Sequence, residues 1–293
     1  MRQLHRFVWL LAAVMVLSHY SGPSYAAELI ITNPKKSSLD KRFEYPIEVL
    51  KLALERTREK YGAVNVQPYP QPLSRKRALI ELVSGNITVF STPTRREWEE
   101  KAIPVRIPIR KGLMGYRLFL IREESQKIFS SIKSIEELKK LSVGQGLQWS
   151  TTAELKKVGF TIDGSTDYES LFNMLMHNRF DYFPRAITEI FTELDLRKDK
   201  FPDMRIEETL SLYLPLPYYF FVSPKHPDLA KRIETGLHMM IQDGSMDLLF
   251  NNYHRQNIDR ANLDNRRILK IKNLDLPPET PFDRKEFWYQ PEQ

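Results

Sequence analysis

Residues 86–122 read NITVFSTPTRREWEEKAIPVRIPIRKGLMGYRLFLIR. This stretch predicts a buried strand at residues 87–90, a Ser/Thr-rich turn at 91–94 and a short helix that opens on Arg95 and Arg96. Hydroxyl groups and a guanidinium suit an anionic group where a strand meets a helix N-terminus, because they donate hydrogen bonds and carry positive charge. The turn therefore predicts one side of a site for a small anion.

The same stretch continues through a bend at residues 111–115 into a further strand at residues 116–121. Gly112 and Gly115 permit backbone conformations that other residues avoid. A strand that leads through a glycine-marked bend into another strand is typical of a hinge between two lobes. We therefore expect a protein that closes around a small ligand next to this hinge.

Strands and helices alternate on both sides of the bend. Before it, strands are expected at residues 29–32, 64–66 and 87–90, and helices at 46–60 and 75–83. After it, apolar spacing and capping boxes predict helices at residues 134–141, 151–158, 168–178, 186–194, 228–241 and 245–253, and strands at 142–143, 181–183, 210–213 and 218–222. Such alternation indicates parallel α/β sheets, whose ligands bind beyond the carboxyl ends of the strands.

The predicted fold is therefore α/β with two lobes, each a mostly parallel sheet with flanking helices, joined by two hinge crossovers. Lobe 1 is expected at residues 27–110 and 214–257, and lobe 2 at residues 111–213. In the last part, residues 258–293, prolines predict an irregular tail with one candidate strand at 269–271, which wraps over the surface or frays.

The N-terminal residues 1–26 have the pattern of an export signal, with Arg2 and Arg6 ahead of an apolar run at 7–17 and small residues before Ala27. The apolar run is too short to span a bilayer comfortably. The chain has no cysteine, which excludes disulfides, thiol catalysis and a lipobox anchor. We expect a protein that is exported to the periplasm of a Gram-negative bacterium.

Composition excludes several other classes of function. Hydrophobic residues make up 42% and charged residues 28% of the 293-residue chain, as in soluble globular proteins. The net charge is +7, but the basic residues are interleaved with acidic ones. They form no stripe of aromatic and basic residues of the kind that binds nucleic acid. No histidine after residue 26 has metal-ligand spacing, and neither a G-x-S-x-G elbow nor a phosphate-cradling glycine loop is present. We therefore expect no catalytic residues, no metal and no cofactor.

Three short motifs resemble the type II periplasmic solute-binding proteins, especially the amino-acid-binding family (family 3) of ABC transporters. Residues 92–95 read TPTR, similar to that family's T-P-E-R turn. Residues 143–146 read VGQG and lead to STT at 150–152, similar to V-G-V-x-x-G-T-T, and DGSMD at 243–247 is similar to a D-G-T closing turn. The motifs occur in the family's order, and the resemblance covers about residues 29–253.

The resemblance implies roles for particular residues. Arg95 would hold a ligand carboxylate with help from Thr92, and the helix N-terminus at Ser150 and Thr151 would meet the ligand from lobe 2. Two aromatic residues have open alternatives. Tyr45 lies where relatives place aromatic rings against the ligand, but it could equally pack under the first helix. Trp149 either lines the cleft or packs between the lobes.

One departure from the family concerns the ligand class. Amino-acid binders have an aspartate after a D-A-V strand that holds the ligand's ammonium group, whereas the strand Asp181-Tyr182-Phe183 runs here into Pro184-Arg185. This change favours an anionic ligand, with Arg185 facing Arg95 from the opposite lobe. The alternative is an ion pair of Arg185 with Glu189.

The leading hypothesis is a monomeric periplasmic solute-binding protein that closes on a small, polar, carboxylate-bearing ligand and delivers it to the membrane permease of an ABC transporter. The first alternative is a protein of the same fold that reports ligand to a membrane sensor. The second is a periplasmic enzyme such as a dehydratase, for which no acid/base constellation is found.

Overall fold

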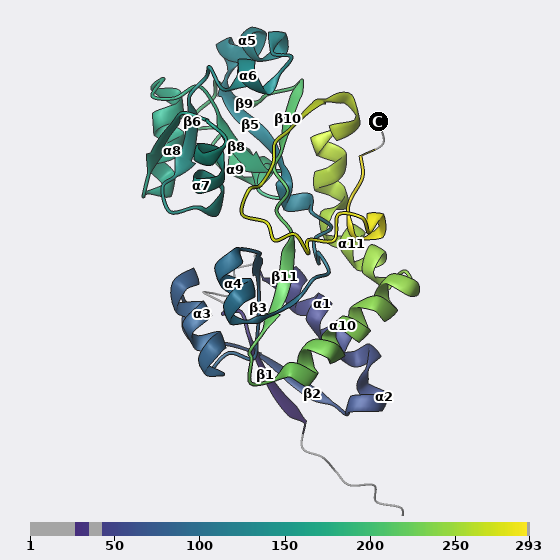
Figure 1. Cartoon of the computed structure of the whole chain (residues 1–293). Coiled ribbons are helices and arrows are strands. Elements are labelled where there is room, and N and C mark those ends of the chain that lie inside the picture. Colours follow the sequence, from purple (N-terminus) through teal and green to yellow (C-terminus); the bar gives the residue numbers. More distant parts are fainter. Residues whose placement is uncertain (1–26, 35–42, 292–293) are drawn as a thin grey trace, which may run out of the picture.

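Helices and strands alternate along the chain as the apolar periodicity predicts, and they form two α/β lobes (Figure 1). This computed structural model describes residues 27–34 and 43–291. The expected export signal at residues 1–26 lies outside the described residues, as do residues 35–42. Lobe 1 is the lower lobe in Figure 1 and lobe 2 the upper.

Lobe 1 is built on five strands: β1 (Glu28–Thr32), β2 (Val64–Pro68), β3 (Val89–Pro93), β4 (Ile103–Val105) and β11 (Tyr218–Val222). Strands β1 and β2 pair in parallel, and β11 lies antiparallel between β3 and β4. A hydrogen bond from Thr88 N to Ile31 O (2.9 Å) joins the β1 and β3 regions. All five residues of β3 are buried, which holds the turn after it in a fixed position.

The helices of lobe 1 are α1 (Glu44–Arg56), α2 (Arg58–Tyr61), α3 (Arg75–Ser84), α4 (Arg96–Lys101) and α10 (Pro227–Gln242). The single helix expected at residues 46–60 is interrupted at Thr57, whose hydroxyl donates to Leu54 O at 2.9 Å. Helix α3 begins where the Ser74 side chain accepts a hydrogen bond from Arg77 N, and it ends at the left-handed Gly85.

Lobe 2 is centred on β5 (Tyr116–Arg122), every residue of which is buried. Around it lie β6 (Val143–Gly146), β7 (Ile162–Ser165), β8 (Phe183–Ala186), β9 (Met204–Ile206), β10 (Leu210–Tyr213) and β12 (Arg267–Lys270). Strand β5 is antiparallel to β8, β9 and β10, whereas β6 and β7 are parallel. The two-lobed α/β fold is confirmed, but its sheets are mixed because β5 and β11 enter them from the opposite lobe.

The helices of lobe 2 are short: α5 (Gln126–Ser131), α6 (Ile135–Leu138), α7 (Ser150–Lys157), α8 (Tyr168–Met176) and α9 (Ile190–Asp195), with the 3-10 turn η2 (Glu123–Ser125) before α5. The capping box expected at Ser134 is present, since its side chain accepts from Glu137 N. Figure 1 shows α7 on the side of lobe 2 that faces α4 of lobe 1. The second-lobe motif at residues 150–152 therefore lies near the inter-lobe face.

Two crossovers, at residues 106–115 and 214–217, run side by side between the lobes. The first contains the 3-10 turn η1 (Leu113–Gly115). Leu214 N donates to Gly115 O (3.1 Å), and Thr94 N donates to Pro217 O (2.9 Å). The second of these bonds ties the predicted anion-binding turn directly to a hinge crossover.

A third connection was not expected from the sequence. Helix α11 (Ser245–Ala261) continues eight residues beyond the predicted end at Tyr253, and after the 3-10 turn η3 (Leu263–Asn265) strand β12 pairs in parallel with β10 of lobe 2. The prediction that residues 258–293 are irregular is therefore wrong for residues 258–261, which continue α11, whereas the candidate strand at 269–271 overlaps β12 at the edge of a sheet.

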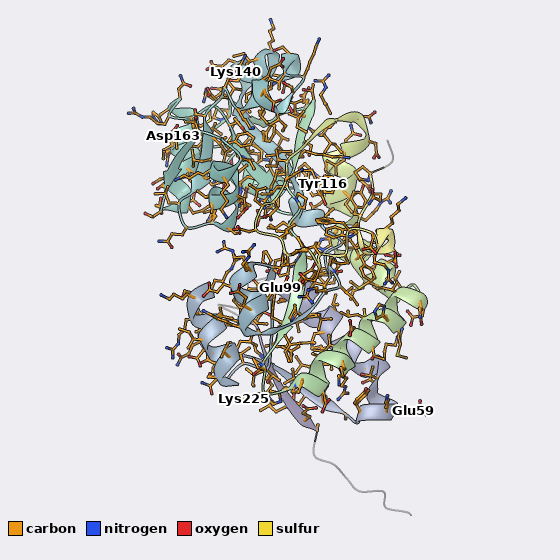
Figure 2. The ribbon with its side chains drawn as sticks, viewed as in Figure 1. Glu59, Glu99, Tyr116, Lys140, Asp163 and Lys225 are labelled. Atoms are coloured by element: carbon orange, nitrogen blue, oxygen red, sulfur yellow. The ribbon has the colours of Figure 1, made fainter. Side chains whose placement is uncertain are left out.

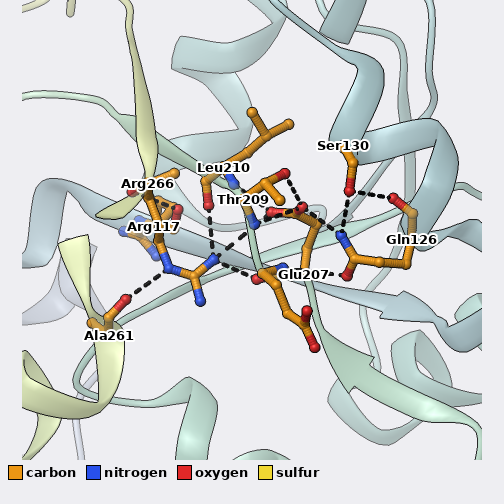
Figure 3. Close-up of polar contacts among 10 residues, drawn as sticks. Arg117, Gln126, Ser130, Glu207, Thr209, Leu210, Ala261 and Arg266 are labelled. Carbon is orange, nitrogen blue, oxygen red and sulfur yellow. Dashed lines mark hydrogen bonds and ion pairs between the residues drawn. The ribbon is translucent and has the colours of Figure 1, made fainter. Parts of the chain in front are cut away.

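A buried polar cluster fixes the junction of α11, β12 and lobe 2 (Figure 3). The fully buried Glu207 accepts hydrogen bonds from Gln126 Nε2 (2.8 Å) and Leu210 N (2.6 Å). Arg266 donates to Ala261 O (2.7 Å), at the end of α11, and to the carbonyl of Glu207. A buried carboxylate and a buried guanidinium with several partners each favour a single arrangement of this junction.

The C-terminal segment, residues 271–291, then returns along the crossovers and contains only the 3-10 turn η4 (Lys285–Phe287). Its Phe287 and Trp288 side chains are buried, and Tyr289 N donates to Lys111 O (2.8 Å). Gly112 has a φ of 68°, and a Cβ atom there would lie 2.6 Å from the Trp288 ring. The segment thus packs onto the hinge and does not simply lie on the surface.

Candidate functional site

The turn after β3 ends at Arg95, where α4 begins on the side of lobe 1 toward lobe 2 (Figure 1). Its neighbour Thr94 donates a hydrogen bond to Glu99, which Arg106 also holds through an ion pair (2.8 Å). Arg95 is the extended N-cap residue of α4, and its side chain is only partly buried. Glu99 lies on the side of lobe 1 that faces lobe 2 (Figure 2). The Glu99 carboxylate is therefore already paired with Arg106, and Arg95 is the cation of this turn that remains for a ligand.

A second polar contact fixes the strands below this turn. Asn33, which follows β1, accepts hydrogen bonds from Ser91 N (2.7 Å) and Ser91 Oγ (2.9 Å), and its amide donates to Ser91 O (2.9 Å). Thr92, the next residue of β3, is buried opposite Tyr219 of β11. These hydrogen bonds thus hold the carboxyl ends of β1 and β3 together, next to the turn that contains Arg95.

Arg75, the first residue of α3, is a second cation of this region that the sequence reasoning missed. Burial, and next the nearby charge of Arg95, lower the pKa of the Arg75 guanidinium. Neither Arg75 nor Arg95 has a side-chain hydrogen bond or ion pair within the part of the chain that the structure describes. Two like charges held near each other, neither of them in an ion pair with a carboxylate among the described residues, favour the binding of an anion.

The lobe 2 side contains Trp149, Ser150 and Thr151 at the start of α7. Trp149 is the N-cap residue, and its ring lies parallel to Phe183 of β8 with centroids 5.9 Å apart. The Thr151 hydroxyl donates to Gln145 Oε1 (3.0 Å), whereas Ser150 is half-buried. The predicted motif at this helix start is therefore formed, with Thr151 bonded inside lobe 2.

Arg185 lies on β8, opposite Leu118 of β5, because the strand continues through Pro184 to Ala186 and does not end at Phe183. It donates to Glu193 Oε2 (2.7 Å) and Oε1 (2.6 Å), and it forms an ion pair with Glu189 (3.0 Å). Burial opposes its charge, but Glu189 and Glu193 outweigh burial and raise the pKa of the guanidinium.

The same guanidinium lies 4.5 Å from the centroid of the Trp149 ring and is 6% exposed. The alternative of an Arg185–Glu189 ion pair is thus present in the structure. The Arg185 guanidinium packs against the Trp149 ring, and both of its carboxylate partners, Glu189 and Glu193, belong to lobe 2.

Tyr45, in the first turn of α1, is 2% exposed and packs below the hinge. Its hydroxyl donates to Ile109 O (2.7 Å) in the first crossover. The Arg110 guanidinium lies 5.3 Å from its ring centroid, and the His254 ring lies 4.7 Å from it. These contacts correspond to the packing alternative for Tyr45 and connect α1 to the crossover.

His254 of α11 gives this hinge packing a pH dependence. Burial, and then the charge of Arg110, lower the pKa of its imidazole to about 3. Because the unfolded chain binds the proton more readily, stability is intact above about pH 6.5 and falls as the pH decreases toward about 3. We expect His254 to contribute a loss of about 2 kcal/mol in unfolding free energy between pH 7 and pH 5.

Urea unfolding at the two pH values measures this loss. His254→Phe keeps a ring between Tyr45 and Phe250 and should reduce the pH dependence by that amount. An unchanged pH dependence in the variant would show that His254 does not titrate with unfolding.

The C-terminal segment adds a carboxylate that sequence reasoning also missed. Asp275 forms an ion pair with Lys157 of α7, and Asn273 donates to Pro215 O (2.9 Å) in the second crossover. Hydrogen bonds with Glu154 and Lys157 lower the pKa of the Asp275 carboxyl, and Arg95 also contributes to this lowering. Burial, and next Asp275, raise the pKa of Glu154 to about 7. The segment therefore passes close to both faces of the candidate site.

The residues predicted from sequence fall into two groups. Arg95 begins α4 of lobe 1, and Trp149 and Ser150 begin α7 of lobe 2, the two helices that face each other in Figure 1, whereas Thr92 and Tyr45 are buried within lobe 1. Among the described residues, no group of three or more His, Asp or Glu side chains could hold a metal ion. The same part of the chain has no helix of the length and apolar character needed to cross a bilayer.

Solved structures of similar fold place this architecture in a known class. An ancestral arginine-binding protein bound to arginine superposes with a TM-score of 0.55 at 19% identity, covering 78% of this chain and 97% of that protein. A Bacillus subtilis protein gives 0.52 at 17% identity, covering 84% and 96%. A Wolinella succinogenes protein, described as a binding component of an ABC transporter complexed with lysine, gives 0.52 at 14% identity, covering 78% and 95%.

No protein-family model matches the sequence, and no curated protein matches it. The structural likenesses, all below 20% identity, establish the fold. The chain has the type II periplasmic-binding-protein fold, in the form found in amino-acid-binding proteins.

Proposed function

We propose that this protein binds a small anionic solute between its two lobes. The observation that carries the proposal is the pair Arg75 and Arg95 beside the carboxyl end of β3, neither of which forms an ion pair with a carboxylate among the described residues. Ligands of α/β sheets bind at such strand ends. A guanidinium can hold a carboxylate through two parallel hydrogen bonds, which makes Arg95 the main anchor and Arg75 an additional cation.

Lobe 2 would complete the site with Trp149 and Ser150 at the start of α7. The Trp149 ring is held in place by Phe183 and Arg185, so that it offers a fixed apolar surface to the ligand. Thr151 and Arg185 would act mainly by positioning, because their polar groups already have partners in lobe 2. Thr92 and Tyr45 would support the lobe 1 face from below.

The proposed ligand class follows from the charges of this chain. Two of the similar structures contain arginine and lysine, which are basic ligands. Here the lobe 1 face carries two cations, and the guanidinium groups of Arg110, Arg117 and Arg185 surround Glu189 in lobe 2. A ligand with a second positive charge would be repelled by this arrangement, whereas a carboxylate-bearing ligand would be attracted.

The lobes would close on the ligand by bending at the two crossovers, and the closed form would be recognised by the permease of an ABC transporter. The proposal includes export to the periplasm and a monomeric state. Its support is the fold, since similar structures include ABC-transporter binding components.

Native mass spectrometry of the purified protein tests the proposal. We expect a fraction of the protein to retain a small acidic metabolite, which is released on denaturation and identified by its mass. A bound basic metabolite, or an acidic one that Arg95→Ala retains equally well, would contradict the proposal.

A further inference from the structure

The C-terminal segment, residues 271–291, connects lobe 2 with the hinge. Figure 1 shows it in yellow between the end of β12 and the turn η4. Near its start, the Asn273 amide donates to Pro215 O (2.9 Å) in the second crossover. Asp275 then forms an ion pair with Lys157 of α7. This end of the segment is therefore attached to lobe 2 and to one crossover.

The other end of the segment packs onto lobe 1 and the first crossover. Phe287 is buried, and its ring centroid lies 6.1 Å from that of His238 in α10 of lobe 1. The Trp288 ring covers Gly112 so closely that a Cβ atom at that glycine would lie 2.6 Å from it. The indole itself is fixed, because its Nε1 donates to Pro281 O at 2.8 Å. The segment thus reaches from lobe 2 across the hinge to lobe 1.

The first crossover contains two successive residues in the left-handed conformation, Lys111 with a φ of 47° and Gly112 with a φ of 68°. Glycine adopts this conformation freely, but a residue with a Cβ atom does so only where its surroundings hold it. Tyr289 N donates to Lys111 O (2.8 Å), and the Trp288 ring packs on Gly112. The C-terminal segment therefore supports the backbone of the hinge at its least favourable point.

Aromatic rings join the segment to both crossovers. Tyr116 follows the first crossover and Tyr213 precedes the second, and their ring centroids lie 4.4 Å apart. The Tyr289 ring lies 5.9 Å from Tyr116 and 6.5 Å from Phe250 of α11. Bending at either crossover would therefore have to move these rings relative to one another.

A hinge moves freely only if the residues that absorb the change in φ and ψ have few other contacts. Here Lys111 and Gly112, which a glycine-marked bend would make the natural pivot, are held by a hydrogen bond and a buried ring. The segment is also attached to lobe 2 at one end and to lobe 1 at the other, so a rotation of the lobes changes the separation of its two attachments.

We infer that residues 271–291 form a brace that restrains the hinge and holds the two lobes at one relative angle in the absence of ligand. The brace acts through Trp288 and Tyr289 on the first crossover and through Asp275 on α7. This inference goes beyond the proposed function and does not depend on it, since it concerns the protein without ligand.

The test measures the distance between the lobes in ligand-stripped protein. The chain has no cysteine, so Lys76→Cys in α3 of lobe 1 and Lys156→Cys in α7 of lobe 2 provide two exposed and unique sites for spin labels. Double electron–electron resonance then gives the distribution of label separations. We expect a single narrow distribution for the otherwise wild-type chain.

Trp288→Ala removes the ring from Gly112 and should make this distribution roughly twofold wider or more, because the lobes then rotate about a released hinge. Gly112→Ala acts on the same contact from the crossover, since its Cβ atom displaces the Trp288 ring, and it should widen the distribution as well. If Trp288→Ala does not fold, Gly112→Ala decides the question.

The matched control is Phe129→Ala, which removes a buried ring of α5 that packs on Phe119 and Tyr182 within lobe 2. It should lower the Tm, as Trp288→Ala does, and leave the distribution of distances narrow.

Four results would overturn the inference. They are a broad distribution in the wild-type background, a distribution in Trp288→Ala or Gly112→Ala as narrow as wild type, equal broadening in Phe129→Ala, and failure of both hinge variants to fold. A narrow distribution together with a lower Tm in Trp288→Ala would show that the segment only adds to the core.

Discussion

Arg95→Ala is expected to abolish ligand-induced thermal stabilisation. Ligand that binds only the native state raises the unfolding free energy, so the increase in Tm at a fixed ligand concentration reports affinity. Loss of a bidentate pair between a guanidinium and a carboxylate should weaken binding by roughly 10²-fold, because each charge-assisted hydrogen bond contributes about 1.5–3 kcal/mol. Differential scanning fluorimetry with the co-purified acidic metabolite measures the loss.

The matched control is Arg96→Ala, which removes the neighbouring, exposed arginine at the first position of α4. It removes the same charge from the same turn and should leave the ligand-induced shift in Tm unchanged. Equal losses in both variants would mean that general electrostatic attraction dominates. Wild-type affinity in Arg95→Ala would show that Arg95 is not the anchor.

Gly236→Ala should strongly destabilise lobe 1. Gly236 lies in α10 where this helix crosses α1, and a Cβ atom there would be 2.0 Å from Ala53 O and 2.6 Å from Ala53 C. Both are backbone atoms, so the overlap is relieved only if the two helices separate and lose buried contacts. We expect a loss of about 3 kcal/mol, although alanine favours helix by about 1 kcal/mol.

Chemical denaturation measures this loss, and Glu234→Ala is the control because residue 234 is an exposed position of the same helix. The control should change the unfolding free energy by about 0.5 kcal/mol or less. If Gly236→Ala is as stable as the control, the close approach of α1 and α10 is not a feature of the protein in solution.

The two-lobed fold could be predicted from sequence because its signals are local. The helix at residues 245–261 was predicted to end at Tyr253, yet its buried residues Phe250, His254 and Ile258 continue at a spacing of four. The polar residues between these buried positions made the apolar periodicity of the helix difficult to recognise from sequence. Strand β12 was missed as a sheet member because its pairing with β10 joins residues far apart in sequence, which no local pattern reports.

The candidate site was predicted in part. Arg95 and Trp149 belong to short motifs with a clear position at helix starts, so sequence could place them. Arg117 and Glu193 have no local motif, and their importance depends on which residues the sheet brings next to them. Arg75 could have been recognised as a cation just after the helix-capping Ser74. Asp275 could not, because only the tertiary path of the C-terminal segment brings it near α7.

The central claim is that the site between the lobes selects an anionic solute. Isothermal titration calorimetry of ligand-stripped protein with acidic amino acids and small carboxylates, in parallel with lysine and arginine, tests it most directly. We predict measurable binding of at least one acidic compound and at least roughly 10-fold weaker binding of both basic amino acids, as expected for a site with excess positive charge. Tight binding of lysine or arginine would contradict the account.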